Sequence, residues 1–312
     1  MCRPADEPFA QTLGAPGTLR VLTFNCGLLR WRVLGYTAFA SPPFVPERFE
    51  AIVCSLPKLL ESRLVDVCAL QEVYEAEHVE RLVRAMSPYM PYHARVDNHR
   101  VLQFHNGLLI FSRHPIDDVS LRKHARSSML ERLFGCKSCL TIRVSLPSGR
   151  SLSLTNLHTT AGGGADPEST AVDDVRESEL LEVMEVCEHT QAAGHESVII
   201  GDLNAGPECS AANYHLLARH GYTDAAADVK PPLGPTWCAS SKLNNLTVFA
   251  KCPDKRIDHL FLHPQASLVP CHAETVFTEP VVRVPAPEPD TAQLSLVPLS
   301  DHYGVLFELD MR

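Results

Sequence analysis

The 312-residue sequence lacks any apolar stretch that reaches the ~20 residues of a membrane-spanning helix. Its opening residues, Met1 to Thr18, also lack a long apolar run after a basic start, so no secretory signal is visible. These two absences argue against a membrane-spanning or a secreted protein. We therefore expect a cytoplasmic protein that, if it acts on membranes, works peripherally from their surface.

Positive charge is also scarce. The chain carries 28 Lys and Arg against 37 Asp and Glu, which gives a net charge of -9. A protein that binds the phosphate backbone of nucleic acid usually has the opposite balance, because neutralising phosphates drives that binding. Nucleic acid is therefore the less expected partner.

No regular cysteine framework is present either. The eleven cysteines are scattered, and an odd number cannot all pair within one chain, so reduced thiols are the simplest interpretation. Cys136 and Cys139 form the only tight Cys-x-x-Cys pair. No second pair or nearby Cys or His completes a zinc site there, which favours a structural role for both.

What the sequence does contain is an alternation of short apolar runs and amphipathic helices. Strands are predicted at residues 20–26, 65–71, 107–112, 139–146, 152–157, 197–201, 257–262 and 303–309. Helices are predicted from Pro46 onward, over 79–86, over 173–193, and between Ser210 and Gly221. Pro57 should bend or divide the first helix. Two long stretches, 159–174 and 279–299, are predicted to be loops.

Strands and helices that alternate over the whole length indicate an α/β fold. Several strand pairs that are adjacent in sequence argue against a purely parallel sheet. Two packed mixed sheets flanked by helices satisfy both observations. One apolar stretch, Trp31 to Phe39, fits either the core of such a fold or an exposed loop that contacts a membrane, and both interpretations stay open.

Polar residues of a few kinds recur at the ends of the predicted strands. Four strands run into Asn25, Gln71-Glu72, His158, and Asp202 with Asn204, and two more open at Asp258 and at Asp301-His302. Open sheets gather ligands at strand ends, where residues from distant segments converge. Asp, Glu, Asn and His together are typical ligands of a hard, oxygen-seeking cation, with groups that transfer protons beside it.

The ordered motifs around these residues resemble those of the endonuclease/exonuclease/phosphatase superfamily. They are Thr23 to Cys26, Leu70 to Val73, Asn106-Gly107, Phe111 to Ile116, Asn156 to His158, Gly201 to Asn204, Arg256 to Asp258, and Ser300 to His302. They extend over residues 20 to 309, nearly the whole chain. The resemblance implies a four-layer α/β sandwich of two packed mixed sheets over residues 19–312, after an N-terminal extension of residues 1–18.

Within this superfamily the sequence is most similar to neutral and bacterial sphingomyelinases. The Phe-Ser-Arg-His-Pro-Ile run at 111–116 resembles their Phe-Ser-Lys-His-Pro-Ile, and residues 298–302 resemble their closing motif. Where many relatives have Tyr after the catalytic Asp, this chain has His259. The resemblance implies a Mg²⁺-dependent phosphodiesterase that acts on a phospholipid or sphingolipid at a membrane surface and releases phosphocholine.

The resemblance also implies which residues hold the metal. Glu72 is expected to be the principal Mg²⁺ ligand, assisted by Asn25. Asp301 is expected at a second cation position or directly behind the first. Mn²⁺ is the alternative cation. The structural alternative for Glu72 is an acidic residue at a helix N-terminus.

Five residues are expected to carry out the chemistry by the same resemblance. Asp202 would orient or help activate the attacking water, and Asn204 would donate a hydrogen bond to a phosphate oxygen. His302 is expected to be the general base, held in the useful tautomer by Asp258. His158 would protonate the leaving group or stabilise the transition state. A simple Asp-x-Asn turn is the structural alternative for Asp202 and Asn204.

Two other activities stay open for the same motifs. A nuclease or another nucleic-acid phosphodiesterase should have a basic groove, whereas this chain is acidic. A phosphoinositide phosphatase should have Lys and Arg clustered beside the Asp-x-Asn motif, whereas Ala205-Gly206-Pro207-Glu208 follows Asn204.

Overall fold

The computed structural model describes residues 17–33, 36–97, 105–127, 137–162, 170–247, 251–285 and 294–311. Its main elements are, in chain order, β1 (Thr18–Asn25), β2 (Leu29–Val33), β3 (Tyr36–Ser41), α1 (Val45–Ser62), β4 (Val67–Gln71), α2 (Ala76–Met86), β5 (Tyr92–Ala94), β6 (Leu109–Ser112), β7 (Ile116–Lys123), β8 (Ser138–Ser145), β9 (Ser151–His158), α4 (Thr170–Ala192), β10 (Glu196–Asp202), α5 (Ala211–Arg219), β11 (Thr223–Asp224), η1 (Asn244–Leu246), β12 (Asp258–Leu262), β13 (Leu268–Val276), β14 (Val282–Pro285), β15 (Leu294–Val297) and β16 (Gly304–Met311). Each predicted strand and helix is confirmed within a few residues of its predicted bounds.

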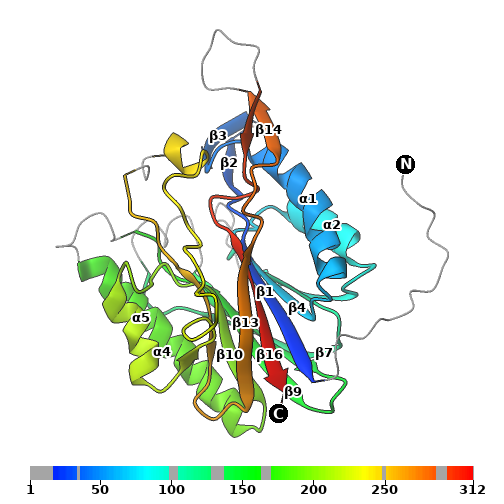
Figure 1. Ribbon diagram of the computed structural model, residues 1–312, viewed down its shortest axis with the longest axis vertical. Helices are drawn as coiled ribbons and strands as arrows, with labels where there is room; N and C mark the ends of the chain where they lie inside the picture. The colour runs from blue at the N-terminus through cyan, green and yellow to red at the C-terminus, as the bar shows by residue number, and fades with distance from the viewer. Residues whose placement is uncertain are drawn as a thin grey trace.

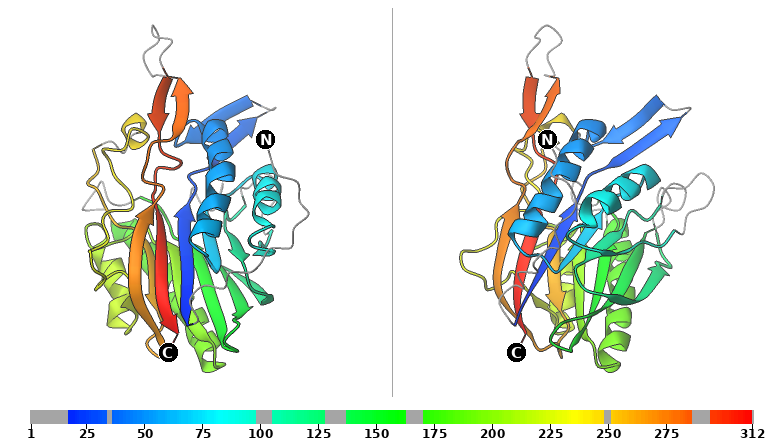
Figure 2. Two further views of the ribbon diagram at one scale, coloured as in Figure 1. Left: turned by 45° about the vertical axis from the view of Figure 1, so that its right-hand side comes forward. Right: turned by 90° about the vertical axis from the view of Figure 1, so that its right-hand side faces the viewer.

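Two six-stranded sheets lie at the centre of the molecule. One has the strand order β13-β16-β1-β4-β6-β5 and the other β11-β12-β10-β9-β8-β7. Both are mixed, because β1 runs parallel to β4 but antiparallel to β16, and β10 runs parallel to β9 but antiparallel to β12. Figures 1 and 2 show α1 and α2 outside the first sheet and α4 and α5 outside the second. The predicted four-layer α/β sandwich is thus confirmed.

Alternation along the strands divides the buried apolar residues into three layers. On β1, Leu22 and Phe24 pack against α1 and α2, whereas Val21 faces the second sheet. On β10, Val198 and Ile200 face the first sheet, and Ile199 packs against α4 and α5. Each sheet is therefore covered on both faces, which accounts for the nearly continuous apolar runs in the sequence.

At one end of the sandwich, strands of both sheets finish close together. Asn25 at the end of β1 is paired with Gln71 at the end of the parallel strand β4. In the other sheet, Asp202 at the end of β10 is paired with His158 at the end of β9 and with Asp258 at the start of β12. The polar strand ends therefore meet at one shared edge, as the sequence predicts.

Two local predictions need correction. The helix α1 is not divided at Pro57 but runs without a break from Val45 to Ser62. Leu56, Pro57 and Leu60 are buried against the core, and this burial offsets the hydrogen bond that proline cannot donate. The predicted loop at 279–299 contains an antiparallel hairpin, β14 and β15, because Val282, Val284 and Val297 are buried in the first apolar layer.

Three further predictions concern membranes, thiols and the chain's start. No helix among the residues listed above is long and apolar enough to cross a membrane. The nine cysteines that the structure describes are all free thiols, as predicted. Cys136, half of the tight pair, lies outside the described residues, as do residues 1–16 of the predicted extension.

Candidate active site

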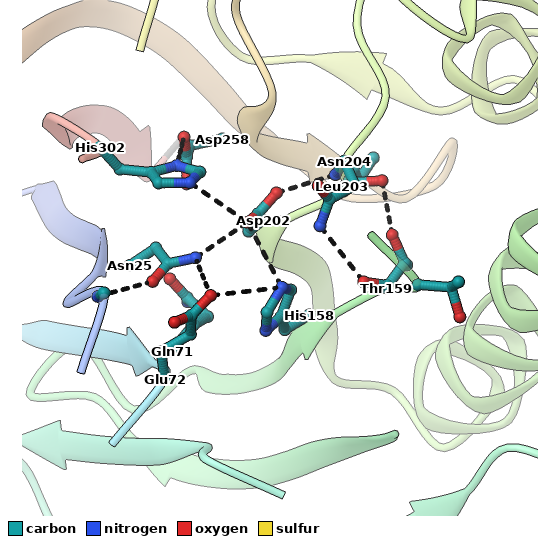
Figure 3. Close-up of polar contacts among 12 residues, drawn as sticks. Asn25, Gln71, Glu72, His158, Thr159, Asp202, Leu203, Asn204, Asp258 and His302 are labelled. Atoms are coloured by element: carbon teal, nitrogen blue, oxygen red, sulfur yellow. Dashed lines mark hydrogen bonds and ion pairs between the residues drawn. The ribbon is translucent and has the colours of Figure 1, made fainter. Parts of the chain in front are cut away.

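The predicted residues of both sheets meet through Asn25. Its Nδ2 donates to Asp202 Oδ2 at 2.9 Å and to Glu72 Oε1 at 3.2 Å. His158 Nε2 lies 3.5 Å from Asp202 Oδ2 and 3.9 Å from Glu72 Oε1. Figure 3 shows these side chains converging between the two sheets, with Asn25 bridging the two carboxylates. The sequence-predicted site is therefore one cluster rather than several separate strand ends.

His302 and Asp258 form a buried pair on the far side of Asp202. His302 Nδ1 donates to Asp258 Oδ2 at 2.9 Å, and Thr236 Oγ1 donates to the same oxygen at 2.6 Å. His302 Nε2 lies 3.7 Å from Asp202 Oδ2 and 4.0 Å from Asp301 Oδ2. Burial opposes protonation of His302, but Asp258, Asp202 and Asp301 outweigh it and raise its pKa to about 10. In the metal-free protein His302 is therefore an imidazolium at neutral pH.

His158 is in the opposite charge state. Its pKa is lowered to about 3, chiefly by burial and also by the positive charge of Lys137, although Asp202 acts in the other direction. A histidine that stays neutral at pH 7 donates or accepts hydrogen bonds but carries no proton that it could give up easily. Of the two histidines beside Asp202, only His302 carries a positive charge.

The Asp202-Leu203-Asn204 segment forms a tight turn at the end of β10. Asn204 N donates to Asp202 Oδ1 at 2.8 Å, and Asn204 itself has a φ of 47°, in the left-handed region. Burial opposes ionisation of Asp202, but His302 and His158 keep its pKa below the usual range. Asn204 Nδ2 donates to Thr159 O at 3.2 Å, so the predicted turn exists and also holds the amide toward β9.

Two buried charged side chains of α4, Arg176 and Glu179, support this part of the site. Glu179 accepts hydrogen bonds from Thr160 N at 2.8 Å and from Thr160 Oγ1 at 2.7 Å. Arg176 Nη2 donates to Thr160 O at 2.9 Å and to Gly162 O at 2.9 Å. Both side chains are fully buried. They hold the segment after His158, to which Asn204 is bonded.

Arg48 of α1 supports the opposite side of the site. Its guanidinium is fully buried and donates to the carbonyls of Cys26, Gly27 and Leu299, which flank Asn25 and Ser300 in the chain. Burial lowers the pKa of Arg48 to about 10, so it stays charged at neutral pH. Ser300 Oγ donates to Asn25 O at 2.7 Å. These bonds fix Asp301 and His302 relative to the end of β1.

A glycine is required at position 27 because Ser300 and Asp301 approach its backbone closely. Gly27 has a φ of 57°, and a Cβ there would collide with the carboxylate of Asp301 and the hydroxyl of Ser300. Asn244 Nδ2 donates to Asp301 O at 3.1 Å from the other side. Asp301 is therefore held against the Asn25 turn, with its carboxylate near His302.

The donors present fit a divalent cation. Four carboxylates lie around this site, those of Glu72, Asp202, Asp258 and Asp301. Burial and the charge of Asp301 raise the pKa of Glu72 to about 7, even though Asn25 donates a hydrogen bond to it. The raised pKa means that the surroundings disfavour the ionised form of Glu72, and the positive charge of a bound cation would stabilise that form.

Two groups of side chains could hold such a cation. One is the predicted set of Glu72, Asn25 and Asp301. The other is Asp202, Asp258 and His302, whose ligand atoms all lie within 4.8 Å of one another. In the second group His302 is already protonated and bonded to Asp258, whereas the first offers oxygen ligands of the kind that Mg²⁺ prefers. Asn25 Oδ1 accepts a hydrogen bond from Gly27 N at 3.0 Å and has a second lone pair for a cation.

Several supporting residues were not found by sequence reasoning. They are Arg48, Arg176 and Glu179. A charged pair at i and i+3 on the apolar stripe of the helix over 173–193 was the one available signal for Arg176 and Glu179.

The sphingomyelinase-like run at 111–116 lies away from this cluster. His114 Nε2 lies 2.9 Å from Asp66 Oδ1, and Arg113 Nε donates to Val65 O at 3.1 Å, at the start of β4 rather than at its catalytic end. In this structure these two residues fix a turn at the opposite end of the sheet.

The two mixed sheets carry an acidic site at their shared edge, and this combination is typical of a class of metal-dependent hydrolases. The model of the endonuclease/exonuclease/phosphatase family matches residues 22–302, and the chain belongs to this family. The family expected from the sequence motifs is thereby confirmed. No curated protein matches the chain.

Several solved structures share this fold. Sphingomyelinase C from Streptomyces griseocarneus is similar with a TM-score of 0.71 and 16% identity, covering 93% of this chain and 99% of its own. A mutant beta toxin from Staphylococcus aureus, solved with bound magnesium ions, has a TM-score of 0.70 and 15% identity, covering 94% and 99%. A family protein from Bacteroides thetaiotaomicron has a TM-score of 0.65 and 15% identity, covering 96% and 100%. At these identities the likeness shows the fold.

Proposed function

We propose that this protein is a Mg²⁺-dependent phosphodiesterase that cleaves a choline-bearing lipid, sphingomyelin or a close relative, and releases phosphocholine. The observation that carries the proposal is the arrangement around Asp202. On one side lies the His302–Asp258 pair, and on the other lie His158, Asn25 and Glu72. Groups that transfer protons and groups that hold a cation are thus placed on two sides of one buried carboxylate.

The cation belongs at Glu72, with Asn25 and Asp301 beside it. Bound there, Mg²⁺ would polarise the phosphoryl oxygens and would offset part of the negative charge that raises the pKa of His302. The neutral form of His302 takes the proton of the attacking water at Nε2, while Asp258 accepts a hydrogen bond from its Nδ1.

The remaining side chains bind and orient the phosphate. Asp202 Oδ2 lies within 4 Å of both imidazoles and directs the water between them. Asn204 uses one amide hydrogen on Thr159 O and has the second for a phosphate oxygen. Neutral His158 donates a hydrogen bond to the phosphoryl group in the transition state, a role that needs no proton transfer. The oxygen of the leaving alcohol takes its proton from solvent water when the P–O bond breaks.

A lipid substrate is supported by three observations. The chain matches sphingomyelinase C over 93% of its own length and 99% of that protein. Its net charge of -9 is unsuited to a nucleic acid backbone. No Lys or Arg follows Asn204 in the segment Ala205 to Glu208, where a phosphoinositide phosphatase is expected to have them.

A hydrolysis panel tests the proposal. Purified protein would be incubated with Mg²⁺ and sphingomyelin, lysophosphatidylcholine, an inositol phospholipid or single-stranded DNA, with His302→Ala as the matched inactive control. We expect phosphocholine release from one of the choline lipids, which chelator and His302→Ala both abolish. Efficient cleavage of DNA, or release of phosphate from the inositol lipid, with both choline lipids untouched, would replace the proposed substrate.

A further inference from the structure

A two-stranded hairpin, β2 and β3, extends directly from the active site. β2 begins at Leu29, four residues after Asn25, and β3 ends at Ser41, just before Pro42 and Pro43, whose carbonyls accept hydrogen bonds from Arg48. Figure 2 shows the hairpin projecting from the body at the same end of the molecule as β14 and β15. The hairpin is thus attached at both ends to the segment that positions the metal ligands.

One face of this hairpin is aromatic. Trp31 is paired with Phe39, and Val33 is paired with Tyr36. Trp31 and Phe39 are directly opposite each other and so share one side of the hairpin. The register shifts between Trp31 and Arg32, beyond which Tyr36 begins β3 with its ring exposed. The exposed fractions of these three side chains are 46%, 52% and 81%. For Trp31, Tyr36 and Phe39 the structure therefore excludes burial in the core, whereas Leu34 of the same stretch lies outside the described residues.

The opposite face is basic and is attached to the body. Arg30 Nε and Nη2 donate to the two carboxylate oxygens of Glu75, each at 2.7 Å, and Arg32 Nη1 lies 3.8 Å from Glu75 Oε2. Glu75 directly precedes α2, so this contact ties the hairpin to the helix layer. A bidentate pair of this kind fixes orientation as well as distance. It turns the aromatic face away from the body.

We propose that this aromatic face is a docking surface for lipid membranes, which holds the active site against the bilayer. The inference rests on the proposed function, because a lipid substrate must be reached at a membrane surface. Trp and Tyr suit that surface, since each combines an apolar ring with a polar group that can stay in water. The site lies at the base of the hairpin, so docking brings the site to its substrate.

A second copy of the chain is a poorer occupant. Three aromatic side chains at these exposures leave roughly 300 to 400 Å² of surface, taking about 200 Å² for a whole aromatic side chain. A stable protein interface needs about 800 Å² from each partner. Contact with a membrane has no such threshold, because a few inserted side chains act together with the fluid lipid surface.

The test compares two double variants, each of which removes two exposed large apolar side chains. Trp31→Ser with Phe39→Ser removes the centre of the aromatic face. Tyr92→Ser with Leu181→Ser is the matched control, because these side chains are 40% and 44% exposed on β5 and α4. Binding to phosphatidylcholine vesicles without sphingomyelin would be measured by co-sedimentation, and turnover would be measured on a short-chain, water-soluble substrate.

We expect the hairpin variant to bind vesicles at least ~10-fold more weakly, with unchanged turnover of the soluble substrate, and the control to behave like the wild type. Equal vesicle binding by the hairpin variant would overturn the proposal, as would an equal loss in the control. A wild-type dimer that the hairpin variant converts to a monomer would assign the face to a second copy instead.

The same experiment separates this inference from the proposed function. If the wild type binds vesicles through the hairpin but hydrolyses no choline lipid, the docking surface stands and the substrate assignment fails. If sphingomyelin in detergent micelles is hydrolysed but the hairpin variant binds vesicles normally, the substrate stands and the docking surface fails.

Discussion

Replacing Asp258 by Asn should separate the effect of a buried charge from that of a hydrogen bond. Asp258 accepts from His302 Nδ1 at 2.9 Å and from Thr236 Oγ1 at 2.6 Å, and it is fully buried. Asn has the same shape and retains one accepting oxygen, but it has no negative charge. Asp258 is the strongest of the three carboxylates that raise the pKa of His302. We therefore expect that pKa to fall in the metal-free variant.

Distances to the imidazole set the scale of this effect. With an effective dielectric constant of ~20, a charge pair at the 2.9 Å of Asp258 is attracted by about 6 kcal/mol, and one at the 3.7 Å of Asp202 or the 4.0 Å of Asp301 by about 4 kcal/mol. These are gross energies, before desolvation. Removing one partner of a buried pair typically costs about 3–5 kcal/mol. If the transition state loses all of it, turnover falls by roughly 10² to 10⁴-fold.

The assay is turnover of a soluble phosphodiester by Asp258→Asn, by His302→Ala and by the double variant. The two changes should be strongly non-additive, so that the double variant is little slower than His302→Ala alone. An NMR titration of the metal-free proteins reports the pKa of His302 independently. Asp228→Asn, an exposed Asp on the same chain, is the control for loss of one charge. Additive losses, or an unchanged pKa of His302, would refute the pairing.

Two further predictions concern Glu72 and the network behind β12. Glu72→Gln should abolish both the metal-dependent activity and the metal-induced rise in melting temperature. It should also stabilise the metal-free protein by about 1–2 kcal/mol above pH 7, because the raised pKa of Glu72 makes its ionised form unfavourable there. Wild-type activity that persists in excess chelator would contradict this. Asp224 accepts from Arg256 at 2.7 Å, and although burial opposes its ionisation, His259 and Arg256 hold its pKa well below the usual range. Ionised Asp224 therefore stabilises the folded protein above about pH 4, and this stabilisation is lost as the pH falls below that value. In Asp224→Asn the melting temperature should consequently fall less steeply below pH 4 than in the wild type. An equally steep fall in both proteins would argue against this role.

Much of the fold can be predicted from the sequence because its signals are local. Apolar runs such as Val65 to Leu70 mark buried strands, and periodic apolar residues mark the helix over 173–193. The predictions failed where local and nonlocal terms compete. Pro57 disfavours a helix locally, but burial against the first sheet maintains α1. The Pro-rich stretch at 279–299 has weak strand propensity, yet contact of its valines with the first apolar layer makes it a hairpin.

The candidate site shows the same division. Asn25, Glu72, Asp202, Asp258 and His302 were identified from polar residues at strand ends and from a family resemblance, because short motifs carry both signals. Their supporting residues Arg48 and Glu179 come from helices far away in the chain, and nothing in their own neighbourhood marks the backbone groups that they bind. Such contacts exist only after the layers have packed.

The sequence by itself determined which groups are available: four carboxylates, two histidines and three side-chain amides at the ends of strands, in a chain whose apolar pattern forms two sheets. Only the tertiary structure decided their charge states and directions. His158 and His302 are the same residue type, but burial and the positive charge of Lys137 outweigh Asp202 at the first and keep it neutral, whereas the second is surrounded by three carboxylates and is protonated. Likewise, the side chains of Trp31 and Phe39 are exposed because Arg30 and Arg32 of the same hairpin bind Glu75, which turns the aromatic rings outward. Both outcomes depend on electrostatic and packing partners brought together from distant parts of the chain.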